Sequence, residues 1–175
     1  MHDNLSLNIT KEGTEKDFEI IFQNYRLLVY RIAFSYTADS FEAENITQDV
    51  FVKVYYKLGS FQGKSKFSTW IYRITINTCH DYARRKKMIN IEFTDDIDRY
   101  SVASDKLYNE KEIQEEVQKA IKRLPEKLRG MVILRYIEQL SCKEIASIFN
   151  CSVSSVDVNL FRARKLLKNF LTHLI

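Results

Sequence analysis

Turn-forming residues are scarce in this chain of 175 residues, which has only four glycines and one proline. Leu, Ile, Lys and Glu are abundant instead, and such a composition favours helices. No apolar run approaches the roughly 18 residues that cross a bilayer. The polar N-terminus also lacks the pattern of a signal peptide. We therefore expect an all-α protein that resides in the cytoplasm.

Cysteine is too sparse for a disulfide framework or a typical zinc site. The three cysteines, Cys79, Cys142 and Cys151, include no CxxC pair. His80 follows Cys79, but neighbours in a helix point about 100° apart and do not converge on one metal ion. We expect the cysteines to be small buried hydrophobes, and we expect no metal and no cofactor.

Catalytic signatures are missing as well. The sequence has no P-loop glycine pattern, no HExxH and no nucleophile elbow, so we expect a protein that is not an enzyme. The aspartates at 95, 96 and 98 could form a metal or acid/base site, and a nuclease using Asp95 and Asp98 would need a divalent metal. A solvated acidic linker explains them more simply, because a catalytic site needs rigid elements to hold it.

Charge is distributed unevenly along the chain, although the net charge is only +4. Residues 11–90 carry +4, residues 91–116 carry −6 and residues 117–175 carry +7. Two basic blocks around an acidic one are typical of two modules that each meet a polyanion. We predict two small helical domains joined by a flexible linker, with these boundaries: tail 1–13, N-terminal domain 14–90, acidic linker 91–111 and C-terminal domain 112–175.

Apolar residues recur at intervals of three and four along most of the chain, which is the period of amphipathic helices. Thr14 and Ser68 are expected to cap two of them, and Asp39 and Glu42 are expected to open a third. The helical period is lost from about residue 89. We predict helices over these segments: about 14–36, 39–58, 67–87, 108–123, 125–138, 142–149 and 152–171.

The last two of these helices have the features of a helix-turn-helix. Ser141 and Glu144 form a capping box, Ala146 is small where the helices would cross, and Asn150 stands where the turn requires a positive φ. The final helix would bury Val156, Leu160, Ala163 and Leu167. With Lys143, its outward side chains would meet the major groove: Ser154, Asp157, Val158, Phe161, Arg162 and Lys165. A plain helical hairpin would also show a core stripe and a charged face.

The segment FSTWIYRITINTCHDYARRKK at 67–87 presents two helical faces. Phe67, Ile71, Ile74, Thr78 and Tyr82 lie on the core face. The second face combines an aromatic ring with polar and cationic side chains, namely Trp70, Arg73, Asn77, Asp81 and Arg84. Aromatic rings beside cations suit unstacked single-stranded bases. Alternatively, Trp70 packs on the preceding helix, and the cations at 84–87 complement the helix dipole.

These segments together resemble the extracytoplasmic-function (ECF) sigma factors, small two-domain bacterial initiation factors of the sigma-70 family. The segment at 67–87 resembles their promoter-melting element, AENITQDVFVKVYYKLGSF resembles the preceding helix, and the stretch from LPEKLRG to RKLL resembles their C-terminal domain. The resemblance covers about residues 15–171. It implies an RNA polymerase sigma factor that directs promoter recognition, DNA melting and transcription initiation, often in a stress response.

The resemblance also implies roles for individual residues. The −10 element and the melted strand would meet Phe61, Lys66, Trp70, Arg73, Asn77, Arg84 and Arg85. The −35 element would meet the helix-turn-helix residues named above. Gln48, Asp49, Phe51 and Lys53 would dock on the β′ coiled coil of core RNA polymerase, whose β flap would receive the C-terminal domain. Further implied partners are promoter DNA and an anti-sigma factor, in many cases membrane-anchored, so that the protein would be held at the membrane or, when active, associated with the nucleoid.

The chain departs from the family pattern at four positions. Asn45 stands where an acid is usual, and Asp157, Val158 and Asn159 replace a stretch that commonly holds two cations around a serine. Fewer cations weaken phosphate binding, while Asp157 can accept from a cytosine amino group and Val158 can touch a thymine methyl. We therefore predict an unusual −35 preference.

Two other classes of function fit part of the sequence. A dimeric repressor with the same helix-turn-helix would bind a symmetric operator without polymerase, and would leave the Trp70 face unexplained. A helical adaptor, in which the basic blocks serve only solubility, would have no affinity for DNA even in low salt.

Overall fold

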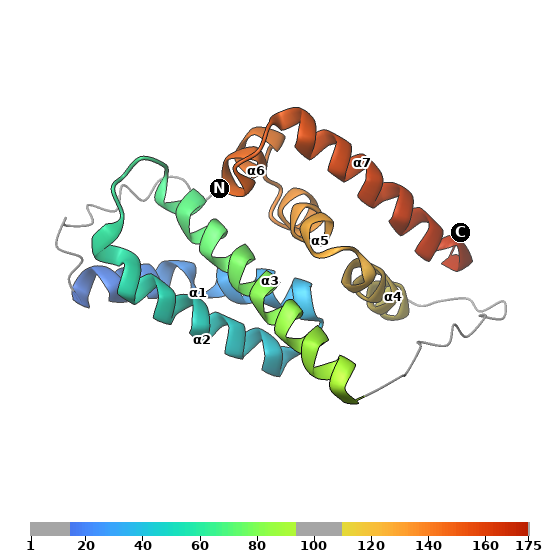
Figure 1. Cartoon of the computed structure of the whole chain (residues 1–175), viewed down its shortest axis with the longest axis horizontal. Coiled ribbons are helices and arrows are strands. Elements are labelled where there is room, and N and C mark those ends of the chain that lie inside the picture. Colours follow the sequence, from blue (N-terminus) through green and yellow to red (C-terminus); the bar gives the residue numbers. More distant parts are fainter. Residues whose placement is uncertain (1–14, 94–109, 175) are drawn as a thin grey trace.

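The computed structural model describes residues 15–93 and 110–174, and every regular element within these ranges is a helix (Figure 1). None of the described helices is long and apolar enough to cross a membrane. The longer helices are, in chain order, α1 Glu15–Thr37, α2 Ser40–Lys57, α3 Phe67–Phe93, α4 Glu110–Arg123, α5 Glu126–Val132, α6 Cys142–Phe149 and α7 Val153–Phe170. Short turns of helix cover η1 Leu58–Ser60, η2 Ile133–Ile137 and η3 Thr172–Leu174.

Helices α1, α2 and α3 form the N-terminal module. Ala38, with φ 53°, reverses the chain after α1, and the Asp39 side chain caps α2 by accepting from the backbone N–H of Glu42 at 2.8 Å. Each pair of the three helices is in contact. The helix expected to open at Asp39 is therefore confirmed, whereas Thr14 lies outside the described residues.

Helix α3 differs from the sequence-based expectation at both ends. It begins at Phe67, so Ser68 lies inside the first turn rather than at the cap, and the N–H of Trp70 bonds to the carbonyl of Lys66 at 3.2 Å. It continues to Phe93, although the apolar period fades from residue 89. The helix continues beyond its apolar stripe because each added residue contributes one more backbone hydrogen bond. The linker aspartates at 95, 96 and 98 lie outside the described residues.

Helices α4 to α7 form the C-terminal module, which contains the expected helix-turn-helix. The capping box is present, since Ser141 accepts from the N–H of Glu144 and the Glu144 carboxylate accepts from the N–H of Ser141. Asn150 ends α6 in the left-handed region at φ 51° and ψ 53°, and Ser152 caps α7. Pro125 immediately precedes α5, where its missing N–H costs nothing.

Between α5 and α6 the chain forms one stretch of π-helix, η2. The N–H of Glu138 there bonds to the carbonyl of Ile133, five residues earlier, at 3.1 Å. Gln139 comes next, with φ 57°. The carboxylate of Glu138 accepts from Arg31 on α1. This places Glu138 against the N-terminal module.

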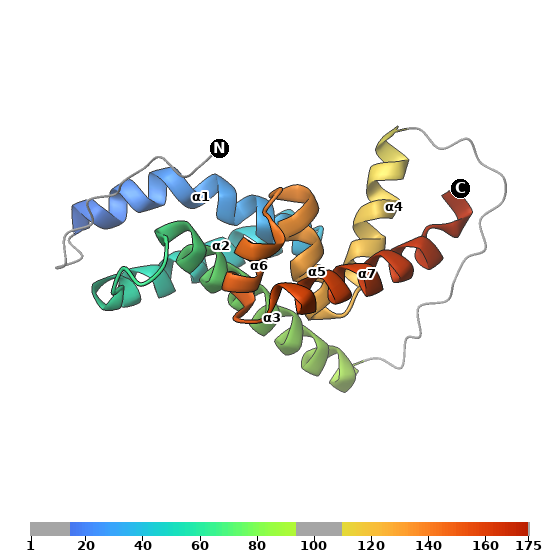
Figure 2. The ribbon, with the colours of Figure 1, turned by 90° about the horizontal axis from the view of Figure 1, so that it is seen from above.

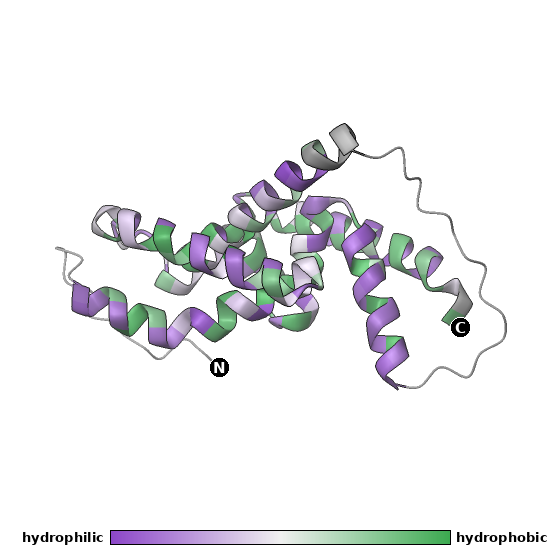
Figure 3. Ribbon diagram, turned by 90° about the horizontal axis from the view of Figure 1, so that it is seen from below, coloured by the Kyte–Doolittle hydropathy of each residue, from purple (hydrophilic) through white to green (hydrophobic). Residues whose placement is uncertain are grey.

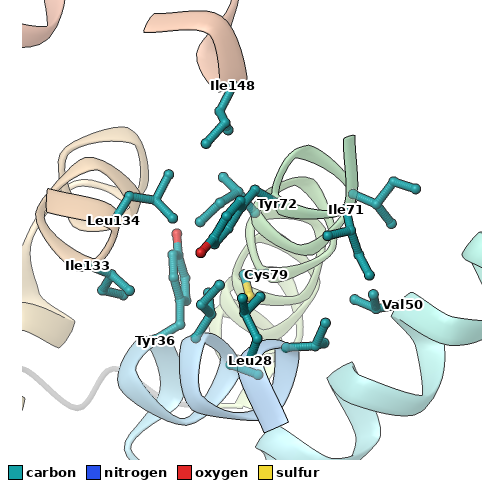
Figure 4. Close-up of a cluster of buried hydrophobic side chains, with 14 of the residues drawn as sticks. Leu28, Tyr36, Val50, Ile71, Tyr72, Cys79, Ile133, Leu134 and Ile148 are labelled. Carbon is teal, nitrogen blue, oxygen red and sulfur yellow. The ribbon is translucent and has the colours of Figure 1, made fainter. Parts of the chain in front are cut away.

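The two modules share one continuous hydrophobic core. Tyr36, Ile71, Tyr72 and Cys79 from the N-terminal module, and Ile133, Leu134 and Ile148 from the C-terminal module, are buried in it (Figure 4). Helix α3 lies in the middle and contacts α1, α2, α5 and α6. Figure 3 shows the apolar faces of the helices turned toward this centre, whereas α4 is largely hydrophilic along its length.

Gly130 allows α6 to pack closely on α5. A Cβ atom at this position would meet the ring of Phe149 at 3.1 Å and Nε2 of His80 at 3.4 Å. The ring of Phe149 on α6 therefore packs directly on the backbone of α5, at a residue that has no side chain, with His80 of α3 beside it. Helix α7 runs along the upper edge of the molecule in the first view, and α6 overlaps the N-terminal helices in the second (Figures 1 and 2).

Candidate nucleic-acid interface

Helix α7 presents an open face of mixed polarity. The stripe expected to be buried is buried at Val156, Leu160 and Ala163 and half-buried at Leu167. All the side chains expected to face outward on α7 are exposed, namely Ser154, Asp157, Val158, Phe161, Arg162 and Lys165. Lys143 on α6 is exposed as well. This face therefore offers hydrogen-bonding groups, cations and apolar contacts together, which is the combination that reads base edges.

The Asp157 side chain is hydrogen-bonded to the first residue of α6. The thiol of Cys142 hydrogen-bonds to the Asp157 carboxylate, and this bond is the main cause that raises the pKa of the thiol. The next residue but one, Asn159, donates to the hydroxyl of Ser155 at 3.4 Å. Two of the positions that depart from the usual pattern are therefore tied to neighbouring residues, and their side chains have defined orientations.

An aromatic cluster stands where the loop after η1 meets the start of α3. The ring of Phe61 lies 5.3 Å from Phe67 and 5.3 Å from Trp70, and the rings of Phe67 and Trp70 are 5.2 Å apart. All three are half-buried, and Gly63, with φ 66°, turns the loop beside them. Lys66 is exposed at the start of α3. Partly exposed rings beside a cation can accept the face of an unstacked base.

The cationic side chains of α3 have different hydrogen-bond and ion-pair partners. Arg84 donates to the Asp81 carboxylate at 2.6 Å, and Arg85 lies 3.7 Å from that of Asp49 on α2. Both arginines are well exposed, so these pairs are weak and open readily to a phosphate. Asn77 is exposed. Arg73, in contrast, donates to the backbone carbonyls of Ser147 and Ile148 on α6, at 2.6 and 3.1 Å.

The outer face of α2 is polar where the sequence predicts docking. Gln48 and Asp49 are exposed, and Lys53 is half-exposed, with its ammonium 3.0 Å from the hydroxyl of Thr78. Phe51, however, is only 3 % exposed, and its ring packs edge-on against Phe22 at 4.8 Å. Phe51 therefore supports this surface from inside and does not lie on it.

The same face of α2 carries exposed apolar side chains to which the sequence patterns assigned no role. Phe41, Val52 and Tyr56 are 76 %, 55 % and 80 % exposed. Their spacing along the helix, offset from the buried stripe, is the signal that could have identified them. Large exposed apolar side chains grouped on one helix mark an interaction surface.

Among the described residues, no group of His, Cys, Asp and Glu could hold a metal ion. Burial raises the pKa of the Cys79 thiol to about 12, so this cysteine is an inert core residue. Cys142 and Cys151 are only half-buried, so the expectation of buried cysteines holds for Cys79 alone.

Comparison with known proteins gives two family models in chain order. Residues 21–88 match "Sigma-70 region 2", and residues 114–167 match "Sigma-70, region 4". The chain is 32% identical to the ECF RNA polymerase sigma factor SigW of Bacillus subtilis over 175 residues, covering 94% of each chain. It is 30% identical to the ECF RNA polymerase sigma-E factor of Escherichia coli K12 over 184 residues, covering 99% and 96%.

Two solved structures resemble the fold. One is the sigma factor RpoE in complex with the anti-sigma factor NepR from Bartonella quintana, with 26% identity and a TM-score of 0.67, covering 90% of this chain and 98% of the other. The other is CnrH in complex with the cytosolic domain of CnrY, with 20% identity and a TM-score of 0.71, covering 99% of both chains.

Proposed function

The chain belongs to the ECF sigma factors of the sigma-70 family, and on this premise we propose how its two modules divide the recognition of a promoter. A sigma factor directs core RNA polymerase to promoters and starts transcription there. It is a regulatory protein whose contribution is binding energy.

The C-terminal module reads the −35 element through α7. Six outward side chains of α7 are exposed together, and the helix lies on the outside of the molecule (Figure 2). Arg162 and Lys165 bind phosphates, while Asp157 and Val158 at the start of the helix contact base edges. Asp157 stands where the family pattern commonly has a cation. We therefore expect a promoter site in which a cytosine amino group faces the Asp157 carboxylate.

The N-terminal module captures the melted strand of the −10 element. Extruding a base costs a few kcal/mol, and stacking on an aromatic ring returns about 1–3 kcal/mol per base. Trp70 and Phe61, 5.3 Å apart, form the surface on which one base stacks. Asn77 hydrogen-bonds a base edge, and Arg73, Arg84 and Arg85 meet the phosphates.

The outer face of α2 docks on the polymerase β′ coiled coil. It offers polar groups at Gln48, Asp49 and Lys53 beside exposed rings at Phe41 and Tyr56. A patch with apolar anchors and a polar rim has the composition of a protein interface. By the same family premise, the C-terminal module contacts the β flap, and an anti-sigma factor, membrane-anchored or free, holds the chain until it is released to the nucleoid.

The observation that carries the proposal is the presence, on one short chain, of an exposed recognition helix and an aromatic cluster beside cations. Run-off transcription with core polymerase and a library of genomic promoter fragments tests it, with and without this chain. We expect specific transcripts only when the chain is present. The variant Trp70→Ala/Asn77→Ala should lose melting, detected by permanganate reactivity of thymines, while Lys127→Ala on α5 should behave as the unchanged chain. If polymerase gains no initiation from the chain, the proposal is wrong.

A further inference from the structure

The first residue of α6 is bonded to the open face of α7. Cys142 is half-buried and packs against the hydrophobic core, whereas Asp157 on α7 is exposed. The thiol of Cys142 donates a hydrogen bond to the Asp157 carboxylate. One partner of this bond is therefore fixed in the body of the module, and the other lies on the face assigned above to the −35 element.

The backbone on both sides of Cys142 is held by hydrogen bonds. Before it, the N–H of Ser141 donates to the Glu144 carboxylate at 2.8 Å. After it, the N–H of Glu144 donates to the Ser141 hydroxyl at 3.3 Å, and the N–H of Ile145 donates to the Ser141 carbonyl at 3.0 Å. A cysteine thiol has only three staggered positions about χ1. The capping box therefore gives the sulfur a defined place from which to donate.

The Asp157 carboxylate gains one orientation from this bond and keeps its capacity to accept. An exposed carboxylate side chain distributes over several staggered rotamers, and a fixed donor on α6 favours the rotamer turned toward it. An ionised carboxylate has two oxygens with about four acceptor sites, and a thiol is a weak donor. The bond therefore orients the carboxylate while it leaves acceptor sites for another group.

The nearest cations have other acceptors in the structure. Arg135 donates to the carbonyl of Leu140 at 2.8 Å, and Arg164 donates to the hydroxyl of Tyr136 at 3.0 Å. An arginine that paired with Asp157 through both of its N–H groups would occupy both carboxylate oxygens. A thiol in place of such a partner keeps one oxygen available.

We propose that Cys142 is a positioning residue for promoter recognition: its thiol turns one carboxylate oxygen of Asp157 toward α6 and directs the other into the major groove, where it accepts from a cytosine amino group. This inference rests on the proposed function, because it assumes that α7 reads the −35 element. Cys142 acts through Asp157, which is one of the positions where the chain departs from the family pattern.

The expected effect is confined to one base pair. A net hydrogen bond changes an equilibrium by about two- to tenfold. The thiol stabilises the carboxylate orientation that the matching base pair requires, so its loss should weaken binding to that base pair and not to the others. Phosphate contacts carry no sequence information directly and do not involve this carboxylate. Nonspecific affinity should therefore stay the same.

Selection by the holoenzyme tests the proposal. Core polymerase is assembled with the full chain or with one of three variants, Cys142→Ala, Cys142→Ser and Cys151→Ala. Each holoenzyme selects fragments from a promoter library randomised over the −35 element, and sequencing gives the base preference at each position. We expect Cys142→Ala to lower the preference for cytosine at one position by about two- to tenfold. Cys142→Ser keeps a donor and should retain the preference.

Cys151→Ala is the matched control. Cys151 is also half-buried and packs against the same core, and its replacement removes the same atom from the helix-turn-helix. We expect it to select like the unchanged chain. The double variant Cys142→Ala/Asp157→Asn should select like Asp157→Asn alone, because Cys142 acts only through that carboxylate. A further loss of preference in the double variant would contradict this order of action.

Thiol reactivity tests the contact itself, without polymerase or DNA. The bond to Asp157 is the main cause that raises the pKa of the Cys142 thiol, whereas Arg135 and Arg164 lower that pKa. Asp157→Asn removes the negative charge, so the thiol should ionise at a lower pH. Alkylation by iodoacetamide over a pH series, read by mass spectrometry, should show this shift at Cys142 and none at Cys151. An unchanged profile at Cys142 overturns the proposal.

The selection outcomes separate this inference from the proposed function. If Cys142→Ala selects the same −35 sequence as strictly as the unchanged chain does, the positioning role is wrong and the function of α7 stands. Preference lost evenly at all positions, or lost equally in Cys151→Ala, indicates a damaged helix-turn-helix and also overturns the role. If the unchanged chain selects no −35 sequence, the assignment of α7 fails and this inference fails with it.

Discussion

The guanidinium of Arg129 on α5 lies 4.6 Å from the centre of the Tyr36 ring on α1, so that a cation of one module rests on an aromatic ring of the other. The same guanidinium donates to the carbonyls of Leu124 at 3.1 Å and Tyr36 at 3.4 Å. The hydroxyl of Tyr36 donates in turn to the carbonyl of Glu126 at 3.2 Å. These contacts join the end of α1, the turn after α4 and the start of α5.

Replacing Arg129 should therefore lower the free energy of unfolding, and the loss should be larger when more of these contacts are removed. We expect Arg129→Met to lower the free energy of unfolding by about 2–4 kcal/mol, since it removes several hydrogen bonds and a partly buried cation–π contact. Arg129→Lys should lose less, because the charge remains over the ring while the planar fork is absent. Urea unfolding followed by circular dichroism measures both. Equal losses in the two variants would contradict the assigned role of the cation.

Asn150 should tolerate glycine but not alanine. Its φ of 51° lies in the left-handed region, which costs a residue with a Cβ atom roughly 1 kcal/mol or more, while glycine pays no such penalty. We expect Asn150→Gly to stay within a few tenths of a kcal/mol of the unchanged chain, and Asn150→Ala to be less stable by about 1 kcal/mol. Thermal unfolding of the matched pair provides the measurement. Identical stabilities would show that the turn relaxes to another conformation.

Asp157 should govern how strongly α7 binds DNA of any sequence. Asp157→Lys replaces an acid with a cation on an exposed face, so we expect tighter nonspecific binding and a salt dependence steeper by about one phosphate contact. Asp157→Asn removes the negative charge without adding a positive one. Its affinity and salt dependence should therefore lie between those of the unchanged chain and of Asp157→Lys. Anisotropy titrations of a random duplex at several salt concentrations measure the slope.

The same residue should also determine the preferred −35 sequence. Selection of promoter fragments by polymerase carrying the unchanged chain should return a base pair that places a cytosine amino group opposite Asp157. Recovery of the sequence that is commonest among ECF promoters would contradict this expectation. Polymerase carrying Asp157→Asn should select less strictly at that position.

His80 should make the free energy of unfolding of the chain depend on pH. Its imidazole lies between Tyr36 of α1, Glu126 and Arg129 of α5 and Phe149 of α6, with Asp81 next to it on α3. Burial is the main cause that lowers its pKa below the usual 6.5; Arg129 lowers it further, whereas Glu126 and Asp81 oppose the shift.

The direction of the effect is set by proton linkage. A histidine whose pKa is lower in the folded state gives its full contribution above pH 6.5, and that contribution is lost as the pH falls from there through the folded value. We expect the free energy of unfolding to fall between about pH 7.5 and 5.5, and expect His80→Phe to reduce that fall. Urea unfolding at the two pH values measures it, and an equal fall in both proteins would exclude His80 as the cause.

Sequence patterns predicted the local structure well where one residue carries a specific backbone or capping requirement. The helix starts at Asp39 and Ser152, the capping box at Ser141 and the left-handed Asn150 are confirmed, because each depends on its own side chain and nearby backbone. The cap expected at Ser68 was wrong. Phe67 already belongs to the helix, and serine in a first turn has the same local signature as serine at the cap.

Contacts between the modules could not be predicted from the sequence. Glu138 carries no local signal that it pairs with Arg31, a residue 107 positions away. The π-helix that turns Glu138 inward depends on tertiary packing, which no period in the sequence reports. The burial of Phe51 was missed for a related reason, because the rings of Phe18 and Phe22 that cover it come from α1. The outward positions of α7 were predicted because helical periodicity alone determines them.

The absence of a side chain at residue 130 has a genetic consequence. A methyl group there would meet the ring of Phe149 at 3.1 Å, so that this ring would have to shift by a few tenths of an ångström. Alanine at this position would thus act as a wedge that alters no charge and no DNA-contacting group. A screen for alleles that lower the stability of this chain without changing its charge should therefore yield replacements of Gly130 by bulky residues.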